Sequence, residues 1–434
     1  MTGIDAITIY IPPYRVDAEK LAQKRGVEPQ KILKGLGMRE ISISAPNQDT
    51  TALGLNAVEK LFREFRYLNP SRIREVAVAT ETPTDLSDGI GTHIVEKFDI
   101  IPENVGVKEI KQACVSGLAE ACSSAEDYKL LVTTDKAVYP LGSGAEFTQG
   151  AGAVALLIGD GDILSVEGKA GRFTLNVPDF FKPIFENDKL EAEKTPKVYG
   201  NLSKIAYTFV TTMAVRDFMK RNNLRLKDID LVVYHIPYPN LPKYAIKAVA
   251  MAEEESEKFM EFEKLSREAI DRFKKFQKEG KGEEELMELD RKEMREYWCR
   301  IKEMINGRYE EAEKKVEPSL KLSPFVGNIY TGSVFLGLIS ALKFGNYREG
   351  SRILTVGYGS GASSVAISWK TNGKTRELVK RIEIEDILKP ERKRYLEIAE
   401  YERWHGKTIP GKINGVNGFY LERVARDGFR FYRK

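Results

Sequence analysis

The stretch KEIKQACVSGLAEA, residues 108–121, contains a change of pattern that indicates the fold class. It begins within a short strand, for which we predict the bounds Val107–Ala113, and continues from Cys114 to Tyr128 as a helix rich in Gly, Ala and Ser. Such small side chains are typical of a helix that packs closely against several neighbours. A strand that leads directly into a buried helix is the repeating unit of α/β proteins.

Further short strands lie on both sides of this unit. Each is an apolar, often β-branched run bounded by Gly, Pro or Asp, and helical patterns separate them. Such runs are typical of strands that are covered on both faces, so we expect a mostly parallel, doubly covered sheet. The predicted elements of the first half are strands over Ile73–Thr80, Val107–Ala113, Lys129–Thr134 and Gly150–Ile158, with a helix over Gly91–Phe98.

The second half of the chain repeats this plan. A buried strand ends at His235, a helix of small residues follows Asn328, and two strands enclose the glycine-rich turn 357–361. The likeness is one of pattern and not of residue identity, and it indicates an internal duplication. The predicted elements of this half are strands over Leu231–Tyr234, Arg352–Gly357 and Ala362–Trp369 and a helix over Gly332–Leu342.

A charged segment, 252–317, interrupts the second half. Its apolar residues recur at three- and four-residue steps, which predicts two amphipathic helices separated by the break at 280–282. From Glu253 to Glu317 there are 21 acidic and 16 basic residues, a net charge of −5. Two interpretations stay open, a solvated hairpin packed on the body by one stripe and an arm that docks a partner or another subunit.

Composition excludes several classes of protein. The chain has 434 residues, a net charge of +4 and 42% hydrophobic residues, which suits two domains or one large α/β unit. No apolar run is long enough to span a membrane, no signal peptide is visible, and no basic run interleaved with aromatic residues points to nucleic acid. Three cysteines indicate a reducing, cytoplasmic location, and no His/Cys cluster has metal-ligand spacing.

Cys114 is the first candidate for chemistry. At a strand-to-helix junction a thiol lies near the positive end of the helix dipole, which favours the nucleophilic thiolate, and the free N–H groups there can stabilise an oxyanion. The alternative is a buried, unreactive cysteine. Cys122 and Cys299 lack this placement, and we assign both to packing.

Three other residues follow strands or turns where ligands commonly bind in α/β sheets. His235 ends a buried strand, Glu81 follows the strand IREVAVAT as a possible general base, and the amide of Asn328 can orient a histidine or a carbonyl oxygen. Their structural alternatives are a hydrogen-bonded core histidine, a surface acid and a helix cap. The glycine turn 357–361 permits close backbone approach to a ligand. His93 and His405 lack such placement.

Taken together, these residues resemble the 3-hydroxy-3-methylglutaryl-CoA synthase family of the thiolase fold superfamily. The resemblance rests on ATETP (79–83), KQAC (111–114), HIPY (235–238), GNIYTGS (327–333) and GYGSG (357–361) in this order. SGAEFTQGAGAVA (143–155), DFFKP (179–183) and GNLSKIAY (200–207) extend it along almost the whole chain.

The resemblance implies a thiolase-like, five-layered αβαβα fold of two related halves with an inserted helical hairpin. Residues 1–165 would form the first half, 166–251 and 318–434 the second, and 252–317 the hairpin. It also implies a homodimer, association with an acetoacetyl-CoA thiolase, and no metal or other cofactor beyond the CoA thioester substrates.

The resemblance further implies a two-stage reaction of the mevalonate pathway. Cys114 would carry the acetyl group from acetyl-CoA, Glu81 would remove a methyl proton, and His235 would polarise the ketone of acetoacetyl-CoA. Water would then release 3-hydroxy-3-methylglutaryl-CoA. The substrate-binding residues implied are Tyr139, Thr148, Ser203, Lys243, Asn328 and Ser360, with Lys243 contacting CoA phosphates because Asn240 stands where the family commonly has a lysine.

Two alternatives are weighed against this prediction. The first is another condensing enzyme of the same fold, a ketoacyl-carrier-protein synthase III or a thiolase. The former needs no carboxylate at the Glu81 position and the latter uses a second cysteine, so Glu81 and GNIYTGS argue against both. The second is a non-catalytic scaffold subunit, which the presence of all the expected side chains disfavours.

Overall fold

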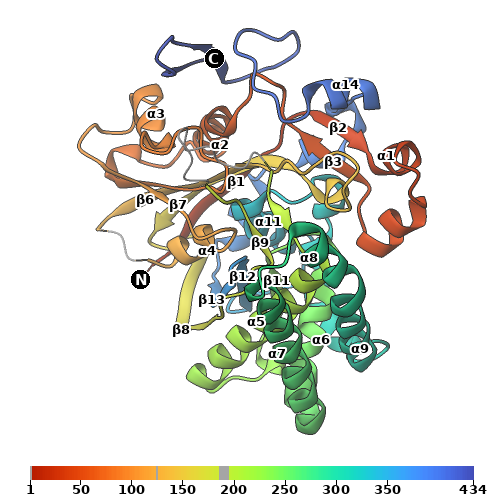
Figure 1. Cartoon of the computed structure of the whole chain (residues 1–434). Helices are drawn as coiled ribbons and strands as arrows, with labels where there is room; N and C mark the ends of the chain where they lie inside the picture. The colour runs from red at the N-terminus through yellow and green to blue at the C-terminus, as the bar shows by residue number, and fades with distance from the viewer. Residues whose placement is uncertain (1, 124–125, 185–194) are drawn as a thin grey trace.

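The computed structural model describes residues 2–123, 126–184 and 195–434, and a nine-stranded sheet runs through its centre (Figure 1). The strands lie in the order β11-β12-β13-β8-β1-β7-β6-β4-β5. The predicted α/β class is therefore confirmed. In chain order the strands are β1 (Gly3–Tyr10), β4 (Ile73–Ala79), β5 (Gly106–Ile110), β6 (Tyr128–Lys136), β7 (Ala151–Gly159), β8 (Leu164–Thr174), β11 (Leu231–Tyr234), β12 (Arg352–Gly359) and β13 (Ser363–Thr371).

The sheet is mixed, so the prediction of a mostly parallel sheet is wrong. β5, β4 and β6 are parallel to one another and β11 is parallel to β12, whereas β7, β1, β8 and β13 run antiparallel to their neighbours. β7 shows the reason for the error. Its sequence AGAVALLIG is buried along nearly its whole length, like a parallel strand, because both faces of the sheet are covered. A continuous apolar run reports burial and not strand direction.

The two halves contain the same order of elements. In the first half β1 leads to α2, β4 to α3, and α4 precedes β6 and β7. In the second half β8 leads to α5, β11 to α6, and α11 precedes β12 and β13. The duplication predicted from the sequence pattern is therefore present. These helices are α2 (Thr50–Glu64), α3 (Ile90–Lys97), α4 (Ser116–Ala121), α5 (Gly200–Asn222), α6 (Leu241–Glu254) and α11 (Ser333–Phe344).

The helices form outer and central layers. α2 packs on β1, β7 and β6, α5 packs on β8, β13 and β12, and α4 and α11 each contact strands of both halves. α4 is shorter than predicted, because Tyr128 already belongs to β6. The small residues of α4 are needed because its neighbours lie very close. A Cβ at Gly117 would lie 2.6 Å from Cγ2 of Thr133 and 3.1 Å from the carbonyl oxygen of Thr331. The small side chains thus allow the central helices to pack tightly.

Between α6 and α11 the chain forms helices that pack on α5 and α6 (Figure 1). The two predicted amphipathic helices are present. The first is α7 (Ser256–Lys278), and the second is a continuous arm of α8 (Glu283–Leu289), the π-helical turn η5 (Asp290–Met294) and α9 (Arg295–Ile305). Their apolar stripes share one core with α5 and α6. α10 (Glu310–Val316) follows. We call 256–316 the inserted arm.

The C-terminal segment of the chain folds over the first half. The carbonyl oxygen of Asn47 accepts a hydrogen bond from the amide of Leu421 at 2.7 Å, and the side chain of Asn56 pairs with both backbone groups of Phe419. The predicted division of the chain into 1–165, 166–251 with 318–434, and 252–317 stays a proposal. The remaining elements include β2 (Tyr14–Asp17), α1 (Ala18–Lys24), η1 (Lys31–Leu36), β3 (Glu40–Ile43), β9 (Phe180–Phe181), β10 (Lys197–Val198), η8 (Tyr330–Gly332), α12 (Thr375–Lys380), α13 (Glu385–Leu388), β14 (Arg394–Tyr395), α14 (Ile398–Trp404), β15 (Tyr420–Val424) and β16 (Arg430–Arg433).

A search of the described helices finds none that is both long enough and apolar enough to cross a membrane.

Candidate active site

Three parallel strands of the first half end at the same edge of the sheet, and polar side chains follow there. Ala79 of β4 pairs with Ile110 of β5, and β4 also pairs with β6. Glu81 comes two residues after β4, Cys114 four residues after β5, and Asp135 is the penultimate residue of β6. The topology thus brings together three groups that are far apart in the sequence, at the edge where α/β sheets bind ligands.

Cys114 and Glu81 are in direct contact. The thiol donates a hydrogen bond to Oε1 of Glu81 over 2.6 Å, and Cys114 is only 6% exposed. Burial and the charge of Glu81 raise the pKa of the thiol well above its ordinary value. Burial and the charge of Asp135 raise the pKa of Glu81 to about 8. Both groups therefore hold their protons at neutral pH, and Glu81 can accept the thiol proton only after it has lost its own.

This electrostatic balance differs from the prediction that the helix end favours a thiolate. α4 begins at Ser116, two residues beyond Cys114, and contains six residues. Its dipole is opposed by burial and by a neighbouring carboxyl group, both of which disfavour the charged sulfur. In the free chain the prediction of a thiolate is therefore wrong, and Glu81 is the group in contact with the thiol that can take its proton.

Asp135 holds the loop that carries Glu81 and the turn that follows Asn328. Its carboxylate accepts hydrogen bonds from the backbone N–H of Glu81 at 2.8 Å and from the hydroxyls of Thr80 and Thr82 at 3.0 and 2.9 Å. It also accepts bonds from the N–H of Thr331 at 3.1 Å and from its hydroxyl at 2.5 Å. One buried carboxylate therefore positions segments of both halves.

His235 and Asn328 occupy the corresponding places of the second half. His235 follows β11 as Glu81 follows β4, and Asn328 precedes α11 as Cys114 precedes α4. Burial lowers the pKa of His235 to about 3, so its imidazole is neutral, and Nδ1 has no partner among the described residues. Oδ1 of Asn328 accepts bonds from the N–H of Tyr330 and the hydroxyl of Ser333. The amide thus caps a turn and also faces the cavity described below.

The glycine turn after β12 lies close to the cysteine. A Cβ at Gly359 would be 2.6 Å from the carbonyl oxygen of Gln112 and 3.1 Å from the N of Val115, so only glycine fits. Beside this turn, the buried carboxylate of Asp179 accepts bonds from Tyr358 at 2.8 Å, from Ser203 at 3.1 Å and from the N–H of Gly361 at 3.2 Å. The turn therefore lies against the cysteine loop, and its predicted close approach to a ligand stays a prediction.

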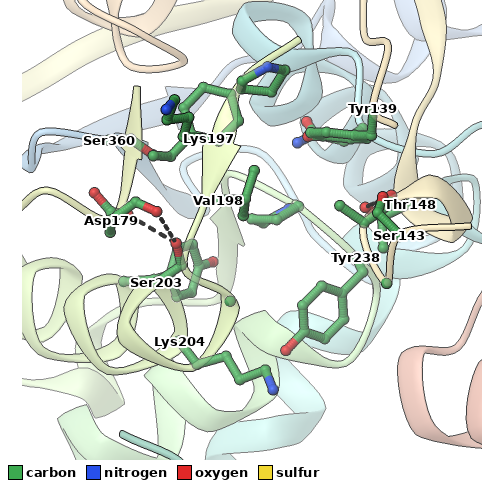
Figure 2. Close-up of a pocket in the computed structure, with 18 of the residues that line it drawn as sticks. Tyr139, Ser143, Thr148, Asp179, Lys197, Val198, Ser203, Lys204, Tyr238 and Ser360 are labelled. Carbon is green, nitrogen blue, oxygen red and sulfur yellow. Dashed lines mark hydrogen bonds between the residues drawn. The ribbon is translucent and has the colours of Figure 1, made fainter. Parts of the chain in front are cut away.

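These groups surround a cavity of about 530 Å³ (Figure 2). Its described lining combines apolar and aromatic side chains with polar and charged ones, which suits a ligand that has both kinds of group. Figure 2 shows Tyr139 and Ser360 at the upper end and Lys204 and Tyr238 at the lower end, with Asp179 bonded to Ser203. The sequence-predicted site residues that line the cavity are Cys114, Tyr139, Thr148, Ser203, His235, Asn328 and Ser360.

Two predicted site residues do not line this cavity. Glu81 is not among the lining residues. Its carboxyl group contacts the sulfur atom of Cys114, and Cys114 lines the cavity. Lys243 forms an ion pair with Glu313 of α10 at 3.1 Å, and Lys247 contacts the same carboxylate at 2.6 Å. The contact predicted between Lys243 and CoA phosphates therefore gains no support from its position.

Sequence reasoning missed four residues of the site. Asp135 and Asp179 position other groups, Lys204 lines the cavity, and Nε2 of His405 donates to the carbonyl oxygen of Tyr139 at 2.8 Å in one tautomer. Asp135 had a usable signal, since it comes directly after the buried run KLLVTT beside the strand that precedes Glu81. Asp179 and Lys204 lie within the motifs DFFKP and GNLSKIAY, which did not single out either side chain, and His405 approaches from a distant segment.

The remaining cysteines and His93 have structural surroundings. Cys122 is partly buried and packs against the main core, as predicted. Cys299 is exposed on α9, so its assignment to packing is wrong. His93 is buried against the ring of Tyr432, with the ring centroids 5.1 Å apart.

The raised pKa of Glu81 predicts how the acetylation of Cys114 that the family resemblance implies would depend on pH. Transfer needs one proton to leave the Cys114–Glu81 pair, and the deprotonated fraction rises as the pH approaches about 8 from below. We expect kcat/KM to rise about tenfold per pH unit below that value and to level off above it. His235 adds no inflection between about pH 5 and 9, because its pKa is about 3. Rates of acetylation measured across this range check the prediction, and an unchanged profile for Glu81→Gln would contradict it.

Known proteins resemble the chain along most of its length. Residues 1–162 match the family model described as hydroxymethylglutaryl-coenzyme A synthase N terminal, and residues 166–398 match the model described as hydroxymethylglutaryl-coenzyme A synthase C terminal. The two matches meet at the start of β8, where the first half of the fold passes into the second.

Individual relatives agree with the family models. A hydroxymethylglutaryl-CoA synthase of Enterococcus faecalis is 28% identical over 422 residues, covering 95% of this chain and 93% of that protein. One from Methanothermobacter thermautotrophicus is 28% identical and covers 94% and 99%. A solved structure of MvaS in complex with 3-hydroxy-3-methylglutaryl coenzyme A matches with a TM-score of 0.79 at 24% identity, covering 100% and 99%. This last likeness shows that the two folds are the same.

Proposed function

The chain belongs to the hydroxymethylglutaryl-CoA synthase family, as its motifs predicted, and we propose that it joins acetyl-CoA, acetoacetyl-CoA and water. The products are 3-hydroxy-3-methylglutaryl-CoA and free CoA, an acyl-transfer and condensation reaction of the mevalonate pathway. The observation that carries the proposal is the contact between Cys114 and Glu81 at the wall of a cavity that His235 and Asn328 also line.

In the first stage, the acetyl group moves to the enzyme. Glu81 accepts the thiol proton of Cys114, and the sulfur attacks the carbonyl carbon of acetyl-CoA. The bond to the CoA sulfur breaks, and that sulfur takes the proton back from Glu81. An acetyl thioester on Cys114 and free CoA result. Backbone N–H groups at Cys114 and Ser360 are our candidates for stabilising the oxyanion, since the turn after β12 lies against the cysteine loop.

In the second stage, a carbon–carbon bond forms. The carboxylate of Glu81 removes a proton from the acetyl methyl group, and the enolate carbon attacks the ketone of acetoacetyl-CoA. The neutral imidazole of His235 and the amide N–H group of Asn328 polarise that ketone by donating hydrogen bonds. The new alkoxide takes the proton from Glu81. Water then cleaves the thioester at Cys114, which releases the carboxylate product, the free thiol and one proton.

The contact with Glu81 also distinguishes this reaction from the alternatives. A ketoacyl-carrier-protein synthase III needs no carboxylate beside its cysteine, and a thiolase uses a second cysteine. The other described cysteines lie elsewhere, Cys122 at the end of α4 and Cys299 exposed on α9. A non-catalytic scaffold has no need of a buried carboxyl group that shares a proton with a thiol.

Mass spectrometry of the intact protein tests the proposal. Incubation with acetyl-CoA should add one acetyl group, and peptide mapping should place it on Cys114. Addition of acetoacetyl-CoA should then discharge the protein and yield 3-hydroxy-3-methylglutaryl-CoA. Cys114→Ala is the negative control, and Cys299→Ala, which removes an exposed thiol, is the matched control that should react normally.

The outcomes separate the candidate functions. If no acetyl group is added to the protein, the proposal that it is an enzyme is wrong. Acetylation followed by transfer to an acyl carrier protein, with no branched CoA product, favours the ketoacyl synthase instead.

A homodimer is part of the proposal. β5 is an edge strand of the central sheet, and Val107 on it is 39% exposed. Pairing of β5 with a second copy would continue the sheet and cover this edge. Association with an acetoacetyl-CoA thiolase, a cytoplasmic location and the lack of any cofactor besides the CoA substrates stay predictions from the family resemblance and from cysteine usage.

A further inference from the structure

The loop between β6 and β7, residues 137–150, forms one side of the cavity, and we call it the wall loop. Its side chains Tyr139, Ser143 and Thr148 lie together on that side (Figure 2). The carbonyl oxygen of Thr148 accepts a hydrogen bond from the N–H of Asn328 at 2.8 Å. The wall loop is therefore joined to the turn that carries a proposed substrate-binding amide.

Tyr139 of the wall loop belongs to an aromatic group beside the cysteine. It is buried in the same cluster of side chains as Cys114 and Tyr330. Its ring meets those of Tyr330 and Phe180 edge to face, with centroids 6.3 and 6.5 Å apart, and the other two rings lie 5.9 Å from each other. An acyl group on the sulfur has to fit beside these rings, so the place of Tyr139 limits how large that group can be.

Side chains bind both backbone polar groups of Tyr139. Its N–H donates to Oε1 of Gln149 at 3.3 Å, and its carbonyl oxygen accepts a bond from Nε2 of His405 at 2.8 Å. A carbonyl oxygen can only accept, so Nε2 holds a proton. Burial lowers the pKa of His405 below its ordinary value, so at pH 7 the neutral ring carries its single proton on Nε2.

Tyr401 of α14 continues this network. Nε2 of Gln149 donates to its hydroxyl at 2.6 Å, and the hydroxyl donates to Oε1 of Glu146 at 2.9 Å. Glu146 belongs to the wall loop, is fully buried, and accepts bonds from Nε and a terminal nitrogen of Arg25 at 2.9 Å each. The hydroxyl of Tyr401 therefore links two buried polar side chains of the wall loop, and one of these holds the N–H of Tyr139.

We propose that Tyr401 and His405 are positioning residues, which fix Tyr139 and so restrict the acyl group on Cys114 to a small size. They act through the wall loop and contact no reacting atom. The proposal rests on the proposed function in one respect, the identification of that acyl group as acetyl. It gives the C-terminal segment a role in the site, although His405 follows Tyr139 by 266 positions in the sequence.

Size-selective modification of Cys114 tests the proposal without any enzymatic reaction. Methyl and propyl methanethiosulfonate each transfer a thioalkyl group to the sulfur and release methanesulfinate, and peptide mapping reports Cys114 separately from the other cysteines. For the wild type we expect the methyl reagent to react about tenfold faster or more, because extra methylene groups are poorly tolerated in a tight pocket. The ratio of the two rates is the quantity to compare among variants.

Tyr401→Phe and His405→Ala should each lower this ratio to about threefold, because the backbone of Tyr139 loses a fixed partner and the ring can move aside. His405→Gln should restore the wild-type ratio, since its amide can donate the same bond. Tyr432→Phe is the matched control. The hydroxyl of Tyr432 is buried in the same C-terminal segment but donates to Asp49, the N-cap of α2, at 3.0 Å, so its loss should leave the ratio unchanged. Thermal unfolding verifies that all variants are folded at the temperature of the assay.

An unchanged ratio in both Tyr401→Phe and His405→Ala overturns the positioning role. An equal fall in Tyr432→Phe also overturns it, because a general loosening of the C-terminal segment then explains the effect. Rates of Cys114 acylation by acetyl-CoA and propionyl-CoA connect the result with the reaction, and the same two variants should lower the preference for acetyl-CoA. If the ratio for the thiol reagents depends on Tyr401 but acetyl-CoA never acylates the wild type, the positioning role stands and the proposed reaction is wrong.

Discussion

Glu81→Ala is expected to keep the acetylation of Cys114 and to lose condensation by about 10³-fold. Condensation needs a base beside the cysteine to remove the acetyl methyl proton. Among the described residues Glu81 is the group that contacts the cysteine and can act as this base. Acetylation persists because Glu81, after burial, is the main cause of the raised pKa of the thiol, so its removal makes the thiolate more available. The two stages can be measured separately, by the mass of the acetyl-protein and by product formation.

A matched variant shows whether the effect belongs to this carboxyl group. Glu96 lies on α3 of the same half, is 62% exposed and pairs with Lys97 at 3.1 Å. Glu96→Gln should therefore leave both stages within about twofold of the wild type, as expected for a surface change. A Glu81→Ala protein that condenses at the wild-type rate would refute the role of Glu81, and one that cannot be acetylated would show that the thiol depends on it absolutely.

Asp135→Ala is expected to lower both stability and activity. The substitution removes the acceptor of five hydrogen bonds and leaves the buried N–H groups of Glu81 and Thr331 unsatisfied. We expect the free energy of unfolding to fall by about 3–5 kcal/mol. Activity should fall by about 10²-fold even where the protein stays folded, because the loop of Glu81 loses its support.

Urea unfolding and steady-state kinetics on the same samples separate these two effects. Asp127→Ala is the control, because Asp127 is partly exposed, lies next to the start of β6 and pairs with Arg72 at 2.7 Å. Loss of such a surface ion pair changes stability by at most about 1 kcal/mol. If Asp135→Ala unfolds no more easily than Asp127→Ala and retains full activity, the buried carboxylate does not organise the site.

The paired placement of residues in the two halves explains much of the site. Glu81 and His235 follow equivalent strands, and Cys114 and Asn328 precede equivalent central helices. The position after the strand thus carries the carboxyl group of Glu81 in one half and the imidazole of His235 in the other. The position before the central helix carries the thiol of Cys114 in one half and the amide of Asn328 in the other. Burial then gives opposite shifts: it raises the pKa of Glu81 and lowers that of His235, so that both are uncharged at neutral pH.

The sequence alone determined the α/β class, the duplication, the strand ends that carry Glu81, Cys114 and His235, and the two amphipathic helices of the arm. Periodicity, small residues and local motifs contain this information because it depends on neighbours along the chain. The motifs also predicted Asn328 and Ser360 as substrate-binding residues, and both line the cavity.

Only the tertiary structure decided the strand directions, the protonation of the cysteine and the charge at the far end of the cavity. Strand direction was hidden because burial on both faces gives the same apolar run in either orientation. The state of Cys114 depends on Glu81, 33 positions away, and on exclusion of water, neither of which a local pattern contains. In the sequence, Lys204 cannot be told apart from other lysines on helices. In the folded chain the inserted arm, which comes much later in the sequence, packs over its helix, and Lys204 lines the substrate cavity.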